Sequence, residues 1–292
     1  MRPTTRRAPP AGHLPRKRFG QHFLASAWAE KAVRAIAPQP GDVFLEIGPG
    51  TGALTLPLAA TGVPILAVEI DRDLVKHLAG QLPSHVTLVS GDFLTTDVMG
   101  FLTGLQPQRT PAGSGSPEPP RRFRVVGNLP YNLTSPILFR LIELQQRHGL
   151  FADACLMMQR EVAERVTAKV GTKAYGVMSI LLARHTRATR LLDLPPGAFS
   201  PPPKVRSSIV RLAFGTPEVR VSDERLLEQL VKAMFLHRRK TLGNALRSFD
   251  ATAPAVLALA QIDPRRRPET LQVSEIARLA ELFASIRRTP VL

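Results

Sequence analysis

The amino-acid sequence predicts an α/β protein in which an open sheet is followed by a smaller, all-helical domain. One observation is the apolar run Val43–Ile47, which indicates a buried strand and leads through a glycine-rich turn into a helix. A second is the change after Val221, where strand signals vanish and helical patterns remain. The chain has 292 residues, 44% of them hydrophobic, which is enough to bury a sizeable core.

The elements follow from the spacing of apolar residues. Residues 28–36 repeat at helical spacing and end before Pro38, which predicts the first helix. Strands are expected at residues 43–47, 65–68, 86–89, 123–127, 155–158, 191–194 and 205–212. Further helices are expected at residues 54–60, 137–144, 161–169 (with Gly171 as a C-terminal cap), 226–235, 239–246, 255–259 and 275–286.

The same patterns divide the chain into parts. Residues 1–15 carry arginines and prolines without apolar periodicity, so we expect a disordered basic tail. Residues 16–215 are expected to form the α/β domain and residues 216–292 the helical domain. Within the α/β domain, residues 104–120 are rich in Pro, Gly, Ser and Gln, which indicates a flexible surface loop without a catalytic part.

A cofactor site is indicated where the first strand meets its helix. Gly48-Pro49-Gly50-Thr51-Gly52 lets backbone approach a ligand closely, and Glu69 ends the next strand about 20 residues on, where an acid can accept from ribose hydroxyls. This combination favours a nucleoside-type cofactor over a structural turn. It leaves open a nicotinamide dinucleotide or S-adenosylmethionine, which has no pyrophosphate.

Three later segments are candidates for the same crevice, beyond the carboxyl ends of the strands. Asn128-Leu129-Pro130-Tyr131 combines an amide, a proline and an aromatic ring that can hold a planar amine. Asp92 follows a strand and can accept from an adenine amino group, although an Asp in a turn is as often a local cap. Phe199 lies in a rigid proline segment and faces the crevice if the flanking strands are the last of the sheet; its alternative role is a hydrophobic pin.

The charge balance points to a polyanionic partner. Lys and Arg number 39 against 23 Asp and Glu, giving a net charge of +16. Nucleic acid is the first candidate, with a merely solvated basic surface as the alternative. The helical domain carries His237-Arg238-Arg239-Lys240, Arg247 and Arg265-Arg266-Arg267, an expected footprint for phosphates.

Composition also argues against other classes. No apolar run approaches the roughly 20 residues of a membrane-spanning helix, so a membrane role is not favoured and a cytoplasmic protein is expected. The single cysteine, Cys155, excludes an internal disulfide and a cysteine-based metal cluster. The histidines show no ligand spacing, so no metal is indicated.

With these motifs in order, the chain resembles the ribosomal RNA adenine dimethyltransferases, specifically those that dimethylate adjacent adenines near the 3′ end of small-subunit (16S) RNA. The likeness runs from about Arg16 to about Ile286. It rests on the segments Arg18-Phe19-Gly20-Gln21-His22-Phe23-Leu24, Glu46 to Gly52, Gly91-Asp92-Phe93, Asn128 to Tyr131 and Phe199-Ser200-Pro201-Pro202-Pro203-Lys204-Val205.

The resemblance implies a Rossmann-like, seven-stranded methyltransferase sheet with an antiparallel last strand, and a helical domain that recognises RNA. It implies S-adenosylmethionine as the cofactor, and the cofactor-binding positions it marks are His22, Leu24, Gly48, Glu69, Asp92 and Asn128. Members usually have asparagine at the position of His22; a neutral imidazole is expected to donate to the cofactor's carboxylate instead. The implied partner is small-subunit RNA within a 30S pre-ribosomal particle, bound by a monomer.

The residue types then suggest a mechanism. The exocyclic amine of adenine is a poor nucleophile, so the Asn128 oxygen and a backbone carbonyl at Leu129 or Pro130 are expected to accept its two hydrogens and align its lone pair with the methyl group. Tyr131 and Phe199 are expected to stack the flipped base. Three alternatives remain open: a large-subunit methyltransferase of the macrolide-resistance type, a mainly non-catalytic assembly factor, and, remotely, a nicotinamide oxidoreductase.

Overall fold

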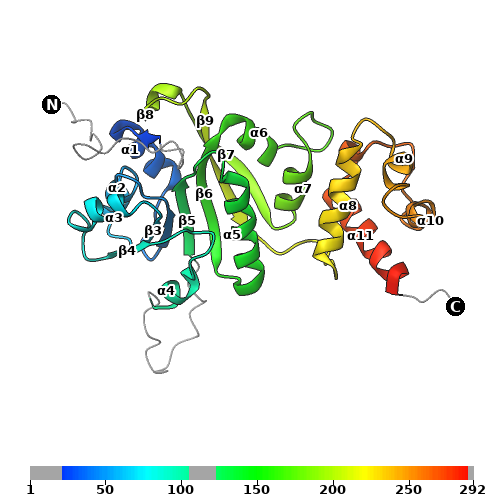
Figure 1. Cartoon of the computed structure of the whole chain (residues 1–292), viewed down its shortest axis with the longest axis horizontal. Helices are drawn as coiled ribbons and strands as arrows, with labels where there is room; N and C mark the ends of the chain where they lie inside the picture. The colour runs from blue at the N-terminus through cyan, green and yellow to red at the C-terminus, as the bar shows by residue number, and fades with distance from the viewer. Residues whose placement is uncertain (1–21, 105–122, 289–292) are drawn as a thin grey trace. The chain divides into compact units, whose positions relative to one another are not determined.

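The computed structural model describes residues 22–104 and 123–288 (Figure 1). The predicted basic tail, residues 16–21 and residues 105–120 of the predicted loop lie outside the described residues. Gly104, the first residue of that loop, is the last residue of helix α4. No helix in the described part of the chain is long and apolar enough to cross a membrane.

A seven-stranded sheet forms the centre of the α/β unit, in the order β4-β3-β2-β5-β6-β9-β7 (Figure 1). The strands are β2 (Val43–Ile47), β3 (Ile65–Glu69), β4 (Val86–Ser90), β5 (Phe123–Asn128), β6 (Phe151–Gln159), β7 (Thr186–Leu194) and β9 (Ser207–Phe214). Strands β4, β3, β2, β5 and β6 pair in parallel, whereas β9, the last strand along the chain, pairs antiparallel with β6. The predicted fold class is confirmed.

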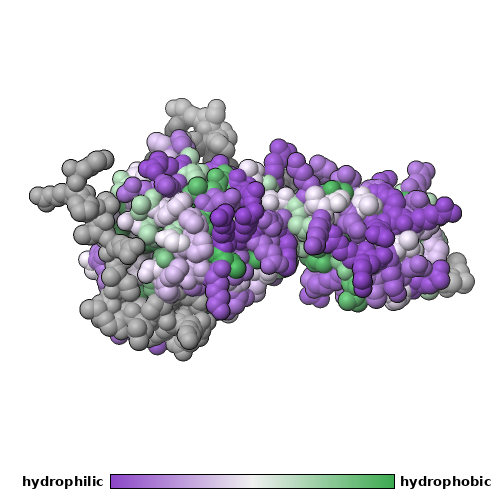
Figure 2. All heavy atoms as spheres, turned by 90° about the horizontal axis from the view of Figure 1, so that it is seen from above, coloured by the Kyte–Doolittle hydropathy of each residue, from purple (hydrophilic) through white to green (hydrophobic). Residues whose placement is uncertain are grey.

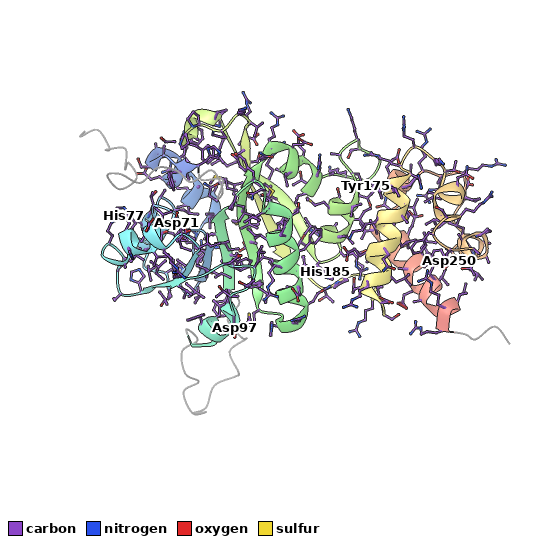
Figure 3. All side chains as sticks on the ribbon, in the orientation of Figure 1. Asp71, His77, Asp97, Tyr175, His185 and Asp250 are labelled. Atoms are coloured by element: carbon purple, nitrogen blue, oxygen red, sulfur yellow. The ribbon has the colours of Figure 1, made fainter. Side chains whose placement is uncertain are left out.

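The helices of this unit are α1 (Ser26–Ile36), α2 (Thr55–Ala59), α3 (Arg72–Ala79), α4 (Val98–Gly104) and α5 (Thr134–His148). Asp71, labelled in Figure 3, begins α3 as its N-cap, with its side chain accepting from the Asp73 N–H at 3.1 Å. A left-handed Gly149 ends α5. Two short strands, β1 (Phe23–Leu24) and β8 (Phe199–Ser200), pair antiparallel; the 3₁₀ turn Pro196–Ala198 precedes β8.

The second unit is helical. It consists of Glu164–Arg187 together with the residues from Gly215 onward, whereas the first consists of the described residues up to Ala163 and of Ala188–Phe214. Its helices are α7 (Val177–Ala183), α8 (Glu224–Leu236), α9 (Leu242–Leu246), α10 (Ala253–Leu259), the 3₁₀ turn Pro268–Thr270 and α11 (Val273–Arg288). The chain therefore enters this unit twice, whereas the sequence suggested a single crossing at residues 215–216.

The early crossing has a clear packing reason. Tyr175 is 2% exposed, belongs to the core of the helical unit, and donates its hydroxyl to the Leu271 carbonyl at 3.0 Å (Figure 3). The preceding helix α6 (Arg160–Val166) is shorter than predicted. Gly171 is thus not its cap; it has φ +83° and donates its N–H to the Glu269 carbonyl at 2.8 Å, within the helical unit.

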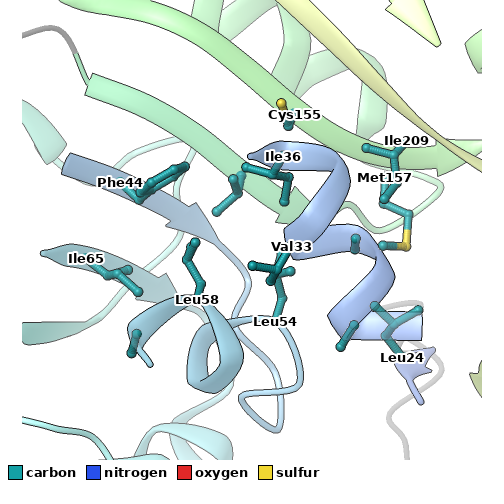
Figure 4. Close-up of a cluster of buried hydrophobic side chains, with 14 of the residues drawn as sticks. Leu24, Val33, Ile36, Phe44, Leu54, Leu58, Ile65, Cys155, Met157 and Ile209 are labelled. Atoms are coloured by element: carbon teal, nitrogen blue, oxygen red, sulfur yellow. The ribbon is translucent and has the colours of Figure 1, made fainter. Parts of the chain in front are cut away.

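One apolar cluster lies between α1, α2 and the sheet (Figure 4). Val33 and Ile36 of α1 and Leu58 of α2 meet Phe44 and Ile65, all of them at most 8% exposed. Removing this apolar area from water stabilises the unit by about 25 cal/mol per Å². The cluster holds α1 and α2 against the strands whose carboxyl ends form the site described below.

Arg124 on β5 ties this cluster to the sheet. Its Nε and Nη2 atoms donate to the two Asp153 oxygens at 2.8 and 2.9 Å, and Nη1 donates to Asp42 at 2.7 Å. The guanidinium also donates to the carbonyls of Ile36 and Ala37 at the end of α1, at 2.9 and 3.1 Å. A bidentate pair of this kind joins two strands and the end of a helix through one side chain.

We expect Arg124→Met to lower the free energy of unfolding by about 3 kcal/mol, because it leaves a buried carboxylate only partly compensated, by Arg211. Urea unfolding of the full chain measures this. The matched control is Arg147→Met, which removes an exposed pair with Glu143 on α5 and is expected to cost less than about 1 kcal/mol. Equal losses for the two variants would contradict the role given to Arg124.

Candidate active site

A cavity opens at the carboxyl ends of β2, β3 and β5, the place where open α/β sheets bind ligands. Its lining comes from the strand ends, the glycine loop, the turn after β5 and the chain at β1. The lining residues are His22, Phe23, Leu24, Glu46, Gly48, Pro49, Gly50, Thr51, Ala53, Leu54, Glu69, Ile70, Leu74, Asn128, Leu129, Pro130, Tyr131 and Leu133. The structure thus brings together eight of the ten predicted site residues; Asp92 and Phe199 are not among them.

Strand register places three of these residues in one row. Ile47 pairs with Val68 of β3 and with Gly127 of β5, so the next residues, Glu69, Gly48 and Asn128, follow side by side on three neighbouring strands. Neighbouring strands lie about 4.8 Å apart. A ligand of roughly 10 Å can therefore touch all three residues.

The glycine loop is held in place by Glu69. One carboxylate oxygen accepts from the Gly50 N–H at 2.9 Å and the other accepts from the Asp71 N–H at 2.8 Å. Gly50 has φ +60°, a conformation that a side chain would strain. Burial raises the pKa of Glu69, and the two N–H donors oppose that rise. Each oxygen retains a lone pair, so the same carboxylate can order the loop and accept from ribose hydroxyls.

The Asn128 amide has one defined orientation. Its Nδ2 atom donates to the His22 carbonyl at 2.7 Å, and since a carbonyl only accepts, Nδ2 and Oδ1 cannot be exchanged. Oδ1 accepts no hydrogen bond from the described residues. Gly127, the residue before Asn128, lets β5 lie close to β2, because a Cβ at this position would lie 2.6 Å from the Ile47 carbonyl oxygen. The structure therefore presents Oδ1 as a free acceptor.

The two backbone carbonyls that follow are not equivalent. The Pro130 oxygen accepts from the Leu133 N–H at 3.0 Å and from the Thr134 hydroxyl at 3.1 Å, at the start of α5. The Leu129 N–H donates to the Met157 carbonyl at 3.0 Å, while the Leu129 carbonyl accepts nothing from the described residues. Of the two carbonyls considered from the sequence, that of Leu129 is the available acceptor.

Tyr131 is fixed from two sides. Its hydroxyl hydrogen-bonds Ser207 Oγ on β9 at 2.9 Å, and its ring stacks on the His22 ring with centroids 5.4 Å apart and planes 26° from parallel. Burial raises the pKa of the Tyr131 hydroxyl and the contact with Ser207 opposes that rise. The ring is therefore held neutral in one orientation at the edge of the cavity.

The His22 side chain makes a different hydrogen bond from the predicted one to a cofactor carboxylate. Its Nδ1 atom lies 2.8 Å from the Pro201 carbonyl, so Nδ1 carries the proton. A neutral ring then has no N–H left to donate to a cofactor carboxylate. The predicted donation does not fit this arrangement; instead, His22 supports Tyr131 with its ring and Asn128 with its backbone carbonyl.

Phe199 is buried, not exposed to the crevice. It is 5% exposed, lies opposite Leu24 in the β1–β8 pair, and belongs to the apolar cluster around α1. The proline segment forms an extra short strand beside β1, which turns the Phe199 ring into the core. In this structure Phe199 is a hydrophobic pin, and the aromatic residues of the described lining are His22, Phe23 and Tyr131.

Asp92 forms a local turn after β4. Its Oδ1 atom accepts from the Leu94 N–H at 2.9 Å, which is the capping role weighed for it from the sequence. Contact of Asp92 with an adenine amino group stays a prediction.

Sequence reasoning missed Glu46 as a site residue. Glu46 lines the cavity, is 1% exposed, and its Oε2 atom has no hydrogen-bond partner among the described residues. Burial raises its pKa to about 8; the nearby Thr55 hydroxyl opposes this rise and the charge of Glu69 adds to it. The available signal was an acid inside an otherwise apolar strand, because such a residue needs a reason to be buried.

The acidic groups of the cavity favour one kind of cofactor. Glu46 and Glu69 are buried in its wall, and no lysine or arginine belongs to the described lining. Buried carboxyls disfavour the pyrophosphate of a nicotinamide dinucleotide and suit a ligand that carries positive charge. S-adenosylmethionine has a sulfonium, an ammonium and a ribose, and therefore fits this set of residues.

Comparisons with known proteins agree with this geometry. The family model described as Ribosomal RNA adenine dimethylase matches residues 12–285. The Ribosomal RNA small subunit methyltransferase A of Acinetobacter baylyi is 39% identical over 274 residues, which cover 92% of this chain and 93% of the relative. Its namesake from Anaeromyxobacter sp. (strain K) is 43% identical over 269 residues, covering 90% and 92%.

A solved structure has the same fold. The crystal structure of a dimethyladenosine transferase from Plasmodium falciparum superposes with a TM-score of 0.66 at 22% identity, over 90% of this chain and 98% of that one. The family match and the two curated relatives cover nearly all of the sequence. The chain belongs to the ribosomal RNA adenine dimethylase family.

Proposed function

We propose that this protein transfers methyl groups from S-adenosylmethionine to the exocyclic N6 of two adjacent adenosines near the 3′ end of 16S ribosomal RNA, two methyls to each. The observation that carries the proposal is the pair of free acceptors at the end of the cavity. Asn128 Oδ1 and the Leu129 carbonyl accept nothing from the described residues, while the neighbouring donors and the Pro130 carbonyl are engaged.

These two acceptors suit an adenine amine. The amine is a weak nucleophile because its lone pair is delocalised into the ring. If Oδ1 and the Leu129 oxygen each accept one of its hydrogens, the nitrogen becomes more tetrahedral and its lone pair points away from the ring plane. Attack on the methyl carbon then forms the N–C bond, the C–S bond breaks with its electron pair on sulfur, and the amine proton passes to solvent.

The cofactor is placed by residues already described. Glu69 would accept from the ribose hydroxyls, and the backbone at Gly48 permits close approach. S-adenosylmethionine supplies the electrophilic methyl and a good leaving group, so the protein contributes orientation and electrostatics. Tyr131 would stack on the flipped base, which positions the amine beside Asn128.

Dimethylation requires a second cycle on the monomethylated amine. That amine has one hydrogen left, so a single acceptor suffices, and the other position must admit a methyl group. The Leu129 carbonyl is fixed by the backbone, whereas Asn128 ends a side chain. We infer that the Leu129 side of the pocket keeps the remaining hydrogen while the first methyl lies toward the apolar lining.

The helical unit supports RNA as the substrate, and its surface is largely hydrophilic in the view of Figure 2. The basic residues predicted there separate into two groups. Arg238 binds the carbonyls of Lys173 and Thr172, and Arg266 binds Glu275, so both hold the unit together. The remaining cations are exposed and have no ion pair within the described residues; they are Arg239, Lys240, Arg247, Arg265 and Arg267.

Two backbone contacts bring these cations together. The Leu242 N–H donates to the Arg266 carbonyl at 2.8 Å, and the Gly243 N–H donates to the Pro264 carbonyl at 3.0 Å. The turn that carries Arg239 and Lys240 therefore lies beside the turn that carries Arg265 and Arg267. Clustered, unpaired cations are the electrostatic footprint of a phosphate backbone.

We expect the double variant Arg239→Gln, Arg265→Gln to bind 16S RNA more weakly and with a salt dependence reduced by about two phosphate contacts. The control, Arg225→Gln with Lys232→Gln, removes two exposed charges on α8 of the same unit and is expected to change binding little. Filter binding over a series of salt concentrations measures both. Equal effects would mean that net charge, not this cluster, drives binding.

The proposed substrate places the enzyme in the cytoplasm, acting as a monomer on a 30S pre-ribosomal particle. The small-subunit assignment is preferred over the macrolide-resistance type because the curated relatives at about 40% identity carry the small-subunit name. The free acceptors at Asn128 and Leu129 favour an enzyme over a purely structural assembly factor. Methylation of 30S subunits that lack the modification tests the proposal; absence of N6,N6-dimethyladenosine in the product would refute it.

A further inference from the structure

We propose that Glu46 is a specificity-determining residue whose carboxylate recognises the positive charge of the cofactor's sulfonium, so that the site prefers the methyl-bearing cofactor to the neutral product left after transfer. This inference rests on the proposed function, because it takes the cofactor to be S-adenosylmethionine. It concerns a residue to which the mechanism above gives no part.

Register places Glu46 directly behind the centre of the site. Glu46 lies on β2, two residues before Gly48, and both residues line the cavity; Gly48 lies between Glu69 and Asn128 in the row described above. A ribose at Glu69 and a methyl directed at Asn128 leave the sulfur, which is bonded to both groups, above Gly48. The sulfonium is therefore the part of the cofactor nearest to Glu46.

Glu46 has an unused oxygen for this purpose. Its Oε2 atom is buried without a hydrogen-bond partner among the described residues. The nearby Thr55 hydroxyl is also buried and likewise has no hydrogen-bond partner there. The other titratable groups in the described lining are Glu69 on β3, His22 before β1 and Tyr131 after β5, and Asp71 follows Glu69 just outside the lining. With no lysine or arginine in the described lining, the site itself supplies no counter-charge for an ionised Glu46.

The free site therefore keeps Glu46 protonated. Its pKa of about 8, raised mainly by burial, means that the neutral form dominates at pH 7. A sulfonium nearby stabilises the carboxylate and lowers this pKa, so binding of the cation releases a proton. After transfer the sulfur is a neutral thioether, Glu46 takes a proton from solvent, and the product loses this attraction.

The sign of the pH dependence follows. Below pH 8, binding of S-adenosylmethionine must displace a proton from Glu46, whereas binding of the neutral thioether product displaces none. Raising the pH toward 8 removes this cost, so the preference for S-adenosylmethionine over S-adenosylhomocysteine rises by up to about tenfold per pH unit and then levels off.

Calorimetric titration of the whole protein with each ligand tests this, because the heat measured in two buffers of different ionisation enthalpy gives the number of protons released. Between pH 6.5 and 7.5 we expect S-adenosylmethionine to release close to one proton more than S-adenosylhomocysteine. Glu46→Gln is expected to abolish this difference and to make the preference independent of pH, apart from titration of the ligands. Glu69→Gln is the matched control. It should weaken the binding of both ligands alike, since both carry the ribose, and it should keep the difference in proton release but shift it to lower pH, because loss of the Glu69 charge lowers the pKa of Glu46.

Equal proton release by the two ligands in the wild-type protein would overturn the proposal, and this measurement needs no variant to fold. A Glu46→Gln protein that keeps the wild-type pH dependence would overturn it as well. If neither ligand binds, the proposed function itself fails; if both bind without the difference, only the role of Glu46 fails.

Discussion

Asn128→Ala is expected to lower methyl transfer roughly 100- to 1000-fold, the usual effect of removing one preorganised polar group from a reacting centre. The amine loses the acceptor that localises its lone pair. Binding of S-adenosylmethionine is expected to fall less, because Glu69 and the glycine loop remain. Single-turnover transfer to 30S subunits measures the first effect, and calorimetry measures the second.

The matched control for this variant is Asn132→Ala. Asn132 is an exposed asparagine in the same turn and does not line the cavity, so its loss should leave transfer unchanged. Unchanged turnover in Asn128→Ala would remove the central acceptor from the mechanism. Equal loss of cofactor binding and transfer would instead mean that Asn128 acts mainly by holding the chain at His22 through its Nδ2 atom.

Tyr131→Ala is expected to weaken capture of the target adenine by about 1–3 kcal/mol, the range measured when one base–aromatic stack is removed. Phe199 is buried and cannot take over this stack, which leaves His22 and Phe23 as the other aromatic residues of the described lining. The effect should appear as a higher KM for RNA, with the single-turnover rate at saturating RNA largely retained.

Tyr131→Phe separates the ring from its hydroxyl. This variant keeps the stacking face and loses only the hydrogen bond to Ser207, so we expect a change of less than about 1.5 kcal/mol in RNA binding. If Tyr131→Phe weakens RNA binding as much as Tyr131→Ala does, the main contribution of this side chain is its orientation by Ser207. If neither variant affects capture, the stacking role is wrong.

Much of the α/β unit could be predicted from the sequence because its strands are short apolar runs between turns. The row of Glu69, Gly48 and Asn128 followed from a general property, since parallel strands of one sheet end at one edge. The sequence pattern alone did not give helix α3. Only two of its residues, Leu74 and Leu78, are buried, and its start depends on a local hydrogen bond at Asp71.

Other features depend on contacts between distant residues. The β1–β8 pair joins positions 24 and 199 and places Phe199 in the apolar cluster around α1. The segment around Tyr175 packs with α8 and α11 through apolar contacts that no local spacing reports. Which nitrogen of His22 is free depends on the Pro201 carbonyl, far along the chain. Such details require the folded structure.

The most direct test of the central claim is transfer of labelled methyl from S-adenosylmethionine to small subunits isolated from cells that lack this enzyme. Purified large subunits are tested in parallel, and the modified bases are identified. We predict N6,N6-dimethyladenosine in 16S RNA alone, from the wild-type protein and not from Asn128→Ala. Label in large-subunit RNA, or small subunits that bind the protein tightly but accept no methyl, would contradict it.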